Sequence, residues 1–328
     1  MSTHKYDDAR YARAFAGRRA LVTGGAGFIG SHLAAALLGL GARVRILDNL
    51  TTGHERNIPQ GAEFIRGSIL DEGALAAAAA GCDLVFHEAA MVSVPQSVEH
   101  PDECVRVNVL GTERVLAAAR ANKADRVLFA ASAAAYGNTP ALPSSEAHLP
   151  DCWSPYAMSK VAGEMLLRTY ALNYGLSTLS LRYFNVFGPR QDPKSPYAAV
   201  ISAFSEAMIA GREPRVMGDG LQTRDFVPIE NIVHANLLGA ASEKPLMGEV
   251  VNVGCAGRIT LLQVLDRMAA VLGRTVRPEH GPPRAGDVRH SSADISRAGE
   301  LLGYEPIVGF DEGIRRTLEW TRGEGARG

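Results

Sequence analysis

Short apolar runs alternate with stretches of helical periodicity through the first half of the chain. Helical patterns predict helices to about residue 40, at about 101–121 and from residue 154, and the alanine run 76–80 is read as plain helix. The apolar runs predict strands at 19–23, 43–47, 63–66, 83–87, 126–130 and 177–182. Strands separated by helices are typical of a parallel sheet covered on both faces. The sequence therefore predicts an α/β fold with a doubly wound parallel sheet.

The regularity loosens after residue 190. Helices are predicted near 198–210, 230–241, 295–302 and 311–320, with a short strand at 215–217 and prolines clustered at 278–283. We interpret 19–190 as mainly the sheet domain and 191–328 as mainly a smaller C-terminal α/β lobe, with some chain crossing back to the sheet. Residues 1–18 form a polar N-terminal extension that could fold into a short surface helix.

Composition narrows the class of protein. The 328 residues are 46% hydrophobic and 21% charged, with a net charge of -1, as in an ordinary soluble globular protein. This balance predicts neither a nucleic-acid nor a membrane partner. The four cysteines are scattered and no Cys/His cluster occurs, so we expect no metal site. Reduced thiols and the absence of an apolar leader favour a cytoplasmic protein.

A glycine-rich turn follows the first predicted strand and opens the first helix. Gly24, Gly27 and Gly30 would permit a tight turn, close approach of the backbone to a pyrophosphate, and close packing of helix on strand. Asp48 ends the second strand, eighteen residues later, where it could accept hydrogen bonds from a ribose diol and repel a 2′-phosphate. The pattern predicts a dinucleotide site that prefers NAD to NADP. We expect the adenine near Ser68 and Ile69.

Tyr156 and Lys160 stand one helical turn apart. Ser154 and Pro155 are typical of a helix start, and Gly175 of a helix end. A free phenol, with a pKa of ~10, is a poor base at neutral pH, and a cation held beside it favours the phenolate. The pair could therefore remove a hydroxyl proton, although the same spacing also occurs on solvated helices.

The chain resembles the extended short-chain dehydrogenase/reductase superfamily, in its nucleotide-sugar epimerase/dehydratase branch. The segments that carry the resemblance run in the family's order through nearly the whole chain. They are Thr23–Gly30, Asn108–Thr112, Ser132–Gly137, Tyr156–Lys160, Arg182–Pro189, Arg224–Val227 and Arg284–Asp287.

The resemblance implies a Rossmann-type domain, a bound NAD and catalytic roles for Ser132, Tyr156 and Lys160, with Asn108 supporting the active-site helices. Ser68 departs from the family's usual aspartate, which weakens the expected contact with the adenine amino group. The expected cofactor-binding residues are Gly24, Gly27, Phe28, Ile29, Gly30, Asp48, Asn49, Ser68, Ile69, Ala89, Ala90, Met91, Asn108, Tyr156, Lys160 and Tyr183.

The resemblance also implies a UDP-sugar substrate. Asn185, Arg224, Arg284 and Asp287 match positions that hold the UDP, and two arginines facing a diphosphate suit charge-assisted hydrogen bonding. Each arginine taken singly could equally be a surface residue. The expected substrate-binding residues are Ser93, Ser132, Tyr156, Asn185, Ala199, Val200, Met217, Arg224, Arg284, Asp287 and Ser291.

The subtype follows from Ala133 and Ala134. Dehydratases of this branch have an Asp-Glu pair at these positions, decarboxylases keep the glutamate, and 3,5-epimerases need a cysteine there. Alanine can transfer no proton, so the resemblance points to a 4-epimerase, which needs only oxidation and re-reduction at C4. A nucleotide-sensing protein without catalysis is disfavoured because Tyr156 and Lys160 are both present.

Sugar preference depends on Ser291, seven residues beyond Arg284. The family has a gatekeeper there, and a tyrosine restricts the enzyme to glucose and galactose. Segments 181–193 and 197–201 look like bacterial epimerases that prefer N-acetylated substrates. We therefore favour UDP-GlcNAc/UDP-GalNAc, with UDP-Glc/UDP-Gal also accepted. Ser291 could instead be an exposed polar residue, which leaves a UDP-Glc/UDP-Gal 4-epimerase or a UDP-uronic-acid 4-epimerase open. The family commonly forms homodimers through helices such as 101–121 and 154–174.

Overall fold

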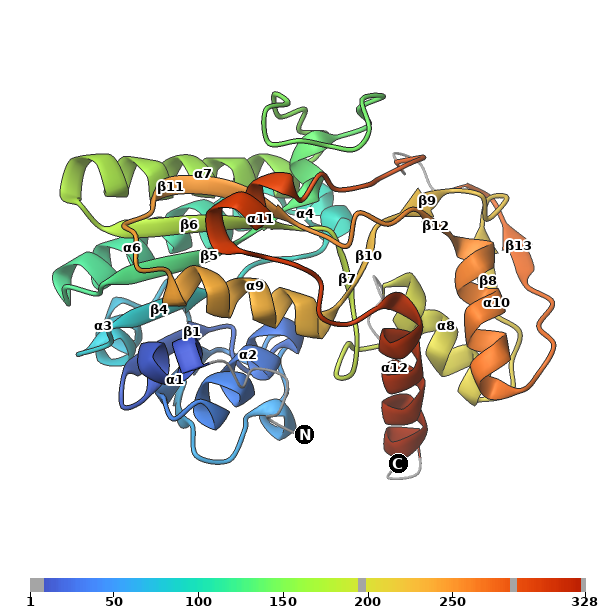
Figure 1. The fold of residues 1–328 in the computed structure, drawn as a ribbon, viewed down its shortest axis with the longest axis horizontal. Coiled ribbons are helices and arrows are strands. Elements are labelled where there is room, and N and C mark those ends of the chain that lie inside the picture. Colours follow the sequence, from blue (N-terminus) through green and yellow to red (C-terminus); the bar gives the residue numbers. More distant parts are fainter. Residues whose placement is uncertain (1–8, 194–198, 284–287, 326–328) are drawn as a thin grey trace.

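A seven-stranded parallel sheet forms the centre of the molecule (Figure 1). The computed structural model describes residues 9–193, 199–283 and 288–325. The strand order is β11-β6-β5-β4-β1-β2-β3, and every neighbouring pair is parallel. The strands are β1 Arg19–Thr23, β2 Arg43–Asp48, β3 Glu63–Arg66, β4 Leu84–His87, β5 Arg126–Ser132, β6 Ser177–Tyr183 and β11 Met247–Val253. The predicted doubly wound α/β sheet is confirmed.

Helices cover both faces of this sheet, as its buried strands require. One face packs against α1 Ala9–Phe15, α2 Phe28–Gly39, α9 Ile229–Ala241 and α11 Ser296–Leu302. The other packs against α3 Glu72–Ala79, α6 Gly111–Ala121 and α7 Pro155–Tyr174. The short helix expected in the N-terminal extension is α1, and its inner face is buried through Tyr11 and Phe15.

A third hydrophobic cluster lies in the lobe that Figure 1 shows beside the sheet, built largely from the C-terminal half. Its helices are α8 Val200–Ile209, α10 Leu261–Leu272 and α12 Phe310–Gly325. Three two-stranded pieces accompany them: β7 Asn185–Phe187 with β10 Phe226–Pro228, β9 Thr223–Arg224 with β12 Ile259–Thr260, and β8 Arg215–Met217 with β13 Glu279–Gly281. The chain returns to the sheet through α9 and β11, while the boundary at residue 190 stays a prediction.

Two local expectations about the helix of Tyr156 are confirmed. The Ser154 hydroxyl caps α7 by accepting a hydrogen bond from the Ala157 amide at 3.1 Å. Gly175 ends the helix in the left-handed region, with φ 68°, where glycine carries no Cβ penalty.

The helix predicted at 101–121 is confirmed in its bounds, but it is not α-helical throughout. It divides into α5 Pro101–Val105, a π-helical turn at Arg106–Leu110, and α6. The π-helical turn contains Asn108, whose side chain is committed to tertiary hydrogen bonds. Such turns occur frequently at functional sites.

The sequence prediction missed several elements. These are α4 Val94–Glu99, α10, β11, the short strands other than β8, and two short 3₁₀ turns, Glu55–Asn57 and Ala133–Tyr136. Within the described residues, none of the helices is both long and apolar enough to cross a membrane. Over the same residues, His, Cys, Asp and Glu side chains nowhere gather in threes to hold a metal ion.

Candidate active site

The glycine turn between β1 and α2 leaves room for a ligand at one position. Gly24 has φ 70°, and a Cβ there would lie 2.8 Å from the Ala89 amide nitrogen. A Cβ on Gly30 would collide with the Gly24 carbonyl group, so Gly30 permits close packing of α2 on the turn. A Cβ on Gly27 would meet only the Gly24 oxygen, at 3.1 Å. No other atom of the described residues, apart from the neighbouring residues in the chain, lies within 4 Å of that position, so the start of α2 can present its amides to an anionic group.

Asp48 braces this turn from the end of β2. Its Oδ2 accepts from the Ala26 amide at 2.9 Å and its Oδ1 from the Leu50 amide at 2.8 Å. Each carboxylate oxygen can accept a second hydrogen bond, so both contacts are compatible with the predicted ribose contact. Neighbouring Asn49 accepts from the Thr51 amide at 3.1 Å.

The three expected catalytic side chains converge at the C-terminal edge of the sheet. Ser132 ends β5, and its hydroxyl is hydrogen-bonded to the Tyr156 phenol in the first turn of α7. Lys160 lies one turn further along and is 3% exposed. Its Nζ donates to the Ala130 carbonyl at 2.8 Å and lies 5.8 Å from the centroid of the Tyr156 ring.

Burial dominates the electrostatics of this cluster. It raises the pKa of the Tyr156 phenol, while the hydrogen bond with Ser132 lowers it. Burial also lowers the pKa of Lys160 to about 8, against the opposing charge of Glu88. We expected the lysine to bring the phenol below its usual pKa, but the net direction here is upward. Phenolate formation therefore calls for further positive charge beside Tyr156.

Asn108 ties the cluster together. It is 2% exposed, its Oδ1 accepts from the Met91 amide at 2.8 Å, and its Nδ2 donates to the Met91 carbonyl at 3.0 Å and the Ser159 hydroxyl at 2.9 Å. One side chain thus connects the segment after β4 to the helix of Tyr156, in line with the supporting role expected for it.

The remaining expected cofactor residues lie along the same edge. Ser68 follows β3 and accepts from the Leu70 amide at 3.1 Å, whereas Ile69 is buried against Gly111. Ala89 follows β4 next to the glycine turn, and Tyr183 ends β6. The others occupy the start of α2 and the segment after β4: Phe28, Ile29, Ala90 and Met91.

The expected substrate-binding residues come from the segments after the sheet strands and from the C-terminal lobe. The Ser291 amide donates to the Thr223 carbonyl at 3.0 Å, which places Ser291 beside Arg224 on β9. Asn185 begins β7, and its amide donates to the Asp225 carbonyl at 3.0 Å. The rest are Ser93 at the cap of α4, Ala199 and Val200 at the start of α8, and Met217 at the end of β8. Arg284 and Asp287 lie outside the described residues.

Three residues beside the expected site residues were missed or underrated. Asp225 is fully buried and accepts from the amides of Cys255 (2.9 Å) and Ala293 (3.1 Å), which holds the segment next to Ser291. His290, expected to be solvated, is partly buried and hydrogen-bonded to the Thr223 hydroxyl at 2.9 Å. Glu88 sits directly after β4 and hydrogen-bonds Tyr183. Its only sequence signal was a carboxylate at the end of a buried strand.

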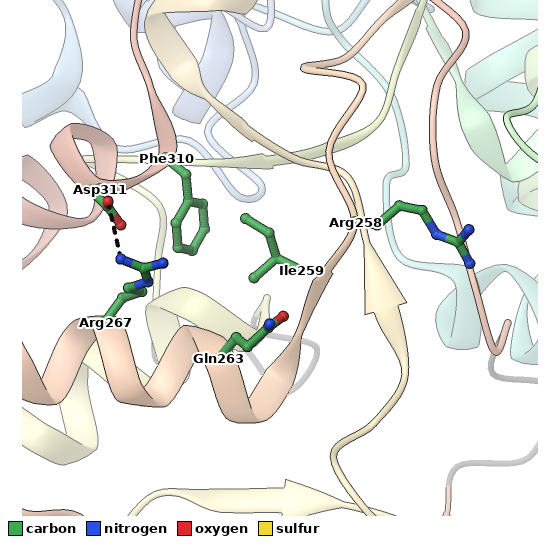
Figure 2. A pocket seen from close by; sticks show the side chains of 6 residues that line it. All are labelled: Arg258, Ile259, Gln263, Arg267, Phe310 and Asp311. Atoms are coloured by element: carbon green, nitrogen blue, oxygen red, sulfur yellow. Dashed lines mark hydrogen bonds and ion pairs between the residues drawn. The ribbon is translucent and has the colours of Figure 1, made fainter.

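A separate surface pocket of about 210 Å³ lies in the C-terminal lobe (Figure 2). Its lining residues are Arg258, Ile259, Gln263, Arg267, Phe310 and Asp311. Arg267 is within 3.5 Å of Asp311, and Figure 2 shows Arg258 pointing away from the other five. None of these residues belongs to the Tyr156 cluster, so this pocket is not the candidate site.

Known proteins resemble this chain along most of its length. It is 39% identical to a putative UDP-glucose 4-epimerase of Methanocaldococcus jannaschii, over 92% of this chain and 98% of the relative. Among solved structures, UDP-N-acetylglucosamine 4-epimerase from Methanobrevibacter ruminantium, in complex with UDP-N-acetylmuramic acid, superposes with a TM-score of 0.90 at 36% identity, covering 94% of this chain and 99% of that chain.

Two further solved structures show the range of sugars in this group. Thermotoga maritima UDP-glucose 4-epimerase with UDP-glucose has a TM-score of 0.89 at 38% identity, covering 93% and 99% of the two chains. UDP-glucuronic acid 4-epimerase from Bacillus cereus, with UDP-glucuronic acid and NAD, has a TM-score of 0.85 at 29% identity and the same coverage.

The family that these similarities indicate also matches this sequence directly. The NAD dependent epimerase/dehydratase family matches residues 20–254, from β1 to the end of β11. This stretch includes the glycine turn, Ser132, Tyr156 and Lys160. The chain belongs to the NAD dependent epimerase/dehydratase family.

Proposed function

We propose that this protein is an NAD-dependent 4-epimerase of UDP-hexoses. The observation that carries the proposal is the cluster of Ser132, Tyr156 and Lys160, with Ala133 and Ala134 in the turn after Ser132. This cluster can remove a hydroxyl proton but has no carboxylate at those two positions to eliminate water or decarboxylate the sugar. The relatives' activities support the same reaction class.

Each residue of the site has its own role in the proposed reaction. Bound NAD would accept a hydride from the sugar C4 and return it to the opposite face. Tyr156 removes the proton of the 4-hydroxyl and returns it to the 4-keto sugar, while Ser132 hydrogen-bonds the same oxygen. Lys160, buried beside the ring, stabilises the phenolate. We propose that residues 19–190 mainly hold the cofactor, with Asp48 on its ribose, and that the C-terminal lobe holds the UDP through Arg224.

The direct test is equilibration of the purified protein with UDP-GlcNAc, UDP-Glc or UDP-glucuronic acid, followed by NMR without added NAD. Appearance of the matching 4-epimer from at least one of them is expected, because NAD is regenerated in each cycle and can stay bound. Failure of all three, even with NAD added, would contradict the proposed function. Conversion of UDP-glucuronic acid alone would mean that the protein acts on UDP-uronic acids rather than on UDP-hexoses.

We further propose that the N-acetylated sugars are preferred because Ser291 leaves space beside Arg224. Ser291→Tyr should lower kcat/KM for UDP-GlcNAc by about tenfold or more relative to UDP-Glc, since one pocket side chain that overlaps a substituent costs 1–3 kcal/mol. Steady-state kinetics with both sugars measure this ratio.

The matched control is Ser296→Tyr, which puts the same side chain on an exposed position of α11. An unchanged ratio in Ser291→Tyr would show that other residues set the sugar preference.

A homodimer is the expected assembly, and α7 presents a surface suited to it. Met158, Met165 and Leu172 repeat every seven residues and are 41%, 64% and 59% exposed, which is an apolar stripe on one helix face. Light scattering should give twice the chain mass of 34.9 kDa, and the Met165→Glu/Leu172→Glu variant should shift toward one chain.

Val271→Glu, on α10, makes the same kind of change at a 43% exposed apolar residue in the other lobe and should stay dimeric. A wild-type mass of one chain would contradict the dimer.

A further inference from the structure

Glu88 has a carboxyl group that the proposed reaction does not use. Its Oε1 accepts a hydrogen bond from the Tyr183 hydroxyl at 2.9 Å, and the Asn236 side chain donates to that hydroxyl at 2.7 Å. Its Oε2 is buried from solvent and has no hydrogen-bond partner among the described residues. Leaving a buried carboxyl oxygen without a partner is costly, so this atom suits contact with a ligand.

The position of Glu88 indicates which part of the site it faces. Its main chain abuts the glycine turn, where a Cβ on Gly24 would lie 3.0 Å from the Glu88 carbonyl carbon. Its charge acts on Lys160 and on Tyr156, raising the pKa of both. Hydride transfer must occur beside Tyr156, because this residue takes the proton from the same hydroxyl. Glu88 therefore lies at the end of the dinucleotide site where the nicotinamide ring has to be.

We propose that Glu88 is a further cofactor-binding residue that faces the nicotinamide half of NAD and favours the oxidised, positively charged ring over the reduced ring. This inference rests on the proposed function. Gln at this position would keep the shape and the contact with Tyr183 but would lose the negative charge.

The inference makes the cofactor preference depend on pH. Burial raises the pKa of Glu88 to about 7, while the Tyr183 hydrogen bond and the charge of Lys160 oppose the rise. A positive ring stabilises the ionised carboxylate, so preference for NAD⁺ over NADH should increase as pH rises through about 7. It should be lost as Glu88 takes up its proton below that pH.

The other groups around Glu88 do not produce the same response in this pH range. α7 contributes Lys160 and Tyr156, β6 contributes Tyr183, and α9 contributes the uncharged Asn236. The pKa of Lys160 is about 8, so this group stays mostly protonated through the lower part of the range and begins to lose its charge only toward pH 7.5. Tyr156 and Tyr183 both have raised pKa values. The glycine turn, residues 24–30, has no titratable side chain.

The experiment is a competition on the full-length protein. Wild type and Glu88→Gln are incubated with fixed mixtures of NAD⁺ and NADH between pH 5.5 and 7.5, and the bound ratio is measured after gel filtration. In wild type the ratio of bound NAD⁺ to NADH should rise with pH, up to about tenfold for each unit by which the ring shifts the carboxyl pKa. In Glu88→Gln it should stay constant within about twofold.

Glu88→Asp keeps the carboxyl group and should restore a pH-dependent ratio. A flat wild-type ratio would overturn the inference, as would a wild-type-like response in Glu88→Gln. If Glu88→Gln lost both nucleotides equally and the wild-type ratio were flat, Glu88 would only hold Tyr183 in place and would not select between NAD⁺ and NADH. If Glu88→Gln fails to fold, the pH dependence of the bound ratio in the wild type and in Glu88→Asp still tests the inference. Failure of the wild type to bind either nucleotide would instead overturn the proposed function.

Discussion

Tyr156→Phe should abolish epimerisation while leaving the cofactor bound. Removal of a general base typically costs 10²–10⁴-fold, and we expect a fall of about 10³-fold in turnover. The phenol is the group that Ser132 hydrogen-bonds and Lys160 approaches, and phenylalanine keeps its packing but cannot take a proton. The glycine turn and Asp48 are untouched, so the NAD content of the purified protein should not change. Turnover is measured by NMR, and NAD by absorbance after acid release.

Tyr170→Phe is the matched control for this result. Tyr170 lies on the same helix, is largely buried, and donates its phenol hydrogen bond to Glu113 at 2.8 Å, away from the cluster. Its loss should change turnover by less than about twofold, because the contact is a single partly buried hydrogen bond. If Tyr156→Phe kept a substantial fraction of wild-type turnover, another group would have to be the base.

The raised pKa of the Tyr156 phenol affects when this residue can act as a base. Burial alone keeps the phenol protonated, and the Lys160 ammonium is shared with the Ala130 carbonyl. A positive nicotinamide ring is the additional charge that would favour the phenolate. The base is therefore expected to be poised only when the oxidised cofactor is present, which is the same state that Glu88 is proposed to favour.

Local signals in the sequence were sufficient for much of the sheet and for the start of the site. The strand at 215–217 was placed to the residue, and the start and end of the Tyr156 helix followed from a serine cap and a glycine stop. These features depend on side chains within a few residues of one another. The glycine turn was recognisable for the same reason.

Features that depend on distant partners were not visible locally. β11 pairs with β6, about seventy residues earlier in the chain. Glu88 becomes notable only because Tyr183, 95 residues later, meets its carboxyl group. The π-helical turn at 106–110 reflects hydrogen bonds that Asn108 makes to residues outside its own helix. α10 is a different case, because its capping box of Thr260 and Gln263 was present in the sequence and was overlooked.

The second large effect should come from a buried ion pair that supports the catalytic helix. Glu164 lies one turn beyond Lys160 on α7 and binds Arg182 of β6 through two hydrogen bonds, at 2.8 Å and 2.7 Å. The two side chains are only 6% and 5% exposed, and the guanidinium lies 4.8 Å from the centroid of the Tyr136 ring. Glu164→Ala would leave the Arg182 charge buried without its partner, so the free energy of unfolding should fall by about 3–5 kcal/mol.

The loss of stability has two contributions, the buried Arg182 charge left without a partner and the lost attraction within the pair. The double variant Glu164→Ala/Arg182→Met separates them. Methionine fills apolar space and carries no charge, so the double variant should be more stable than Glu164→Ala by at least about 1 kcal/mol. Urea unfolding measures both differences. Glu206→Ala, which breaks the exposed pair with Arg212, is the control and should cost no more than about 1 kcal/mol. A double variant less stable than Glu164→Ala would mean that the pair stabilises α7 by attraction and shape rather than by compensating a buried charge.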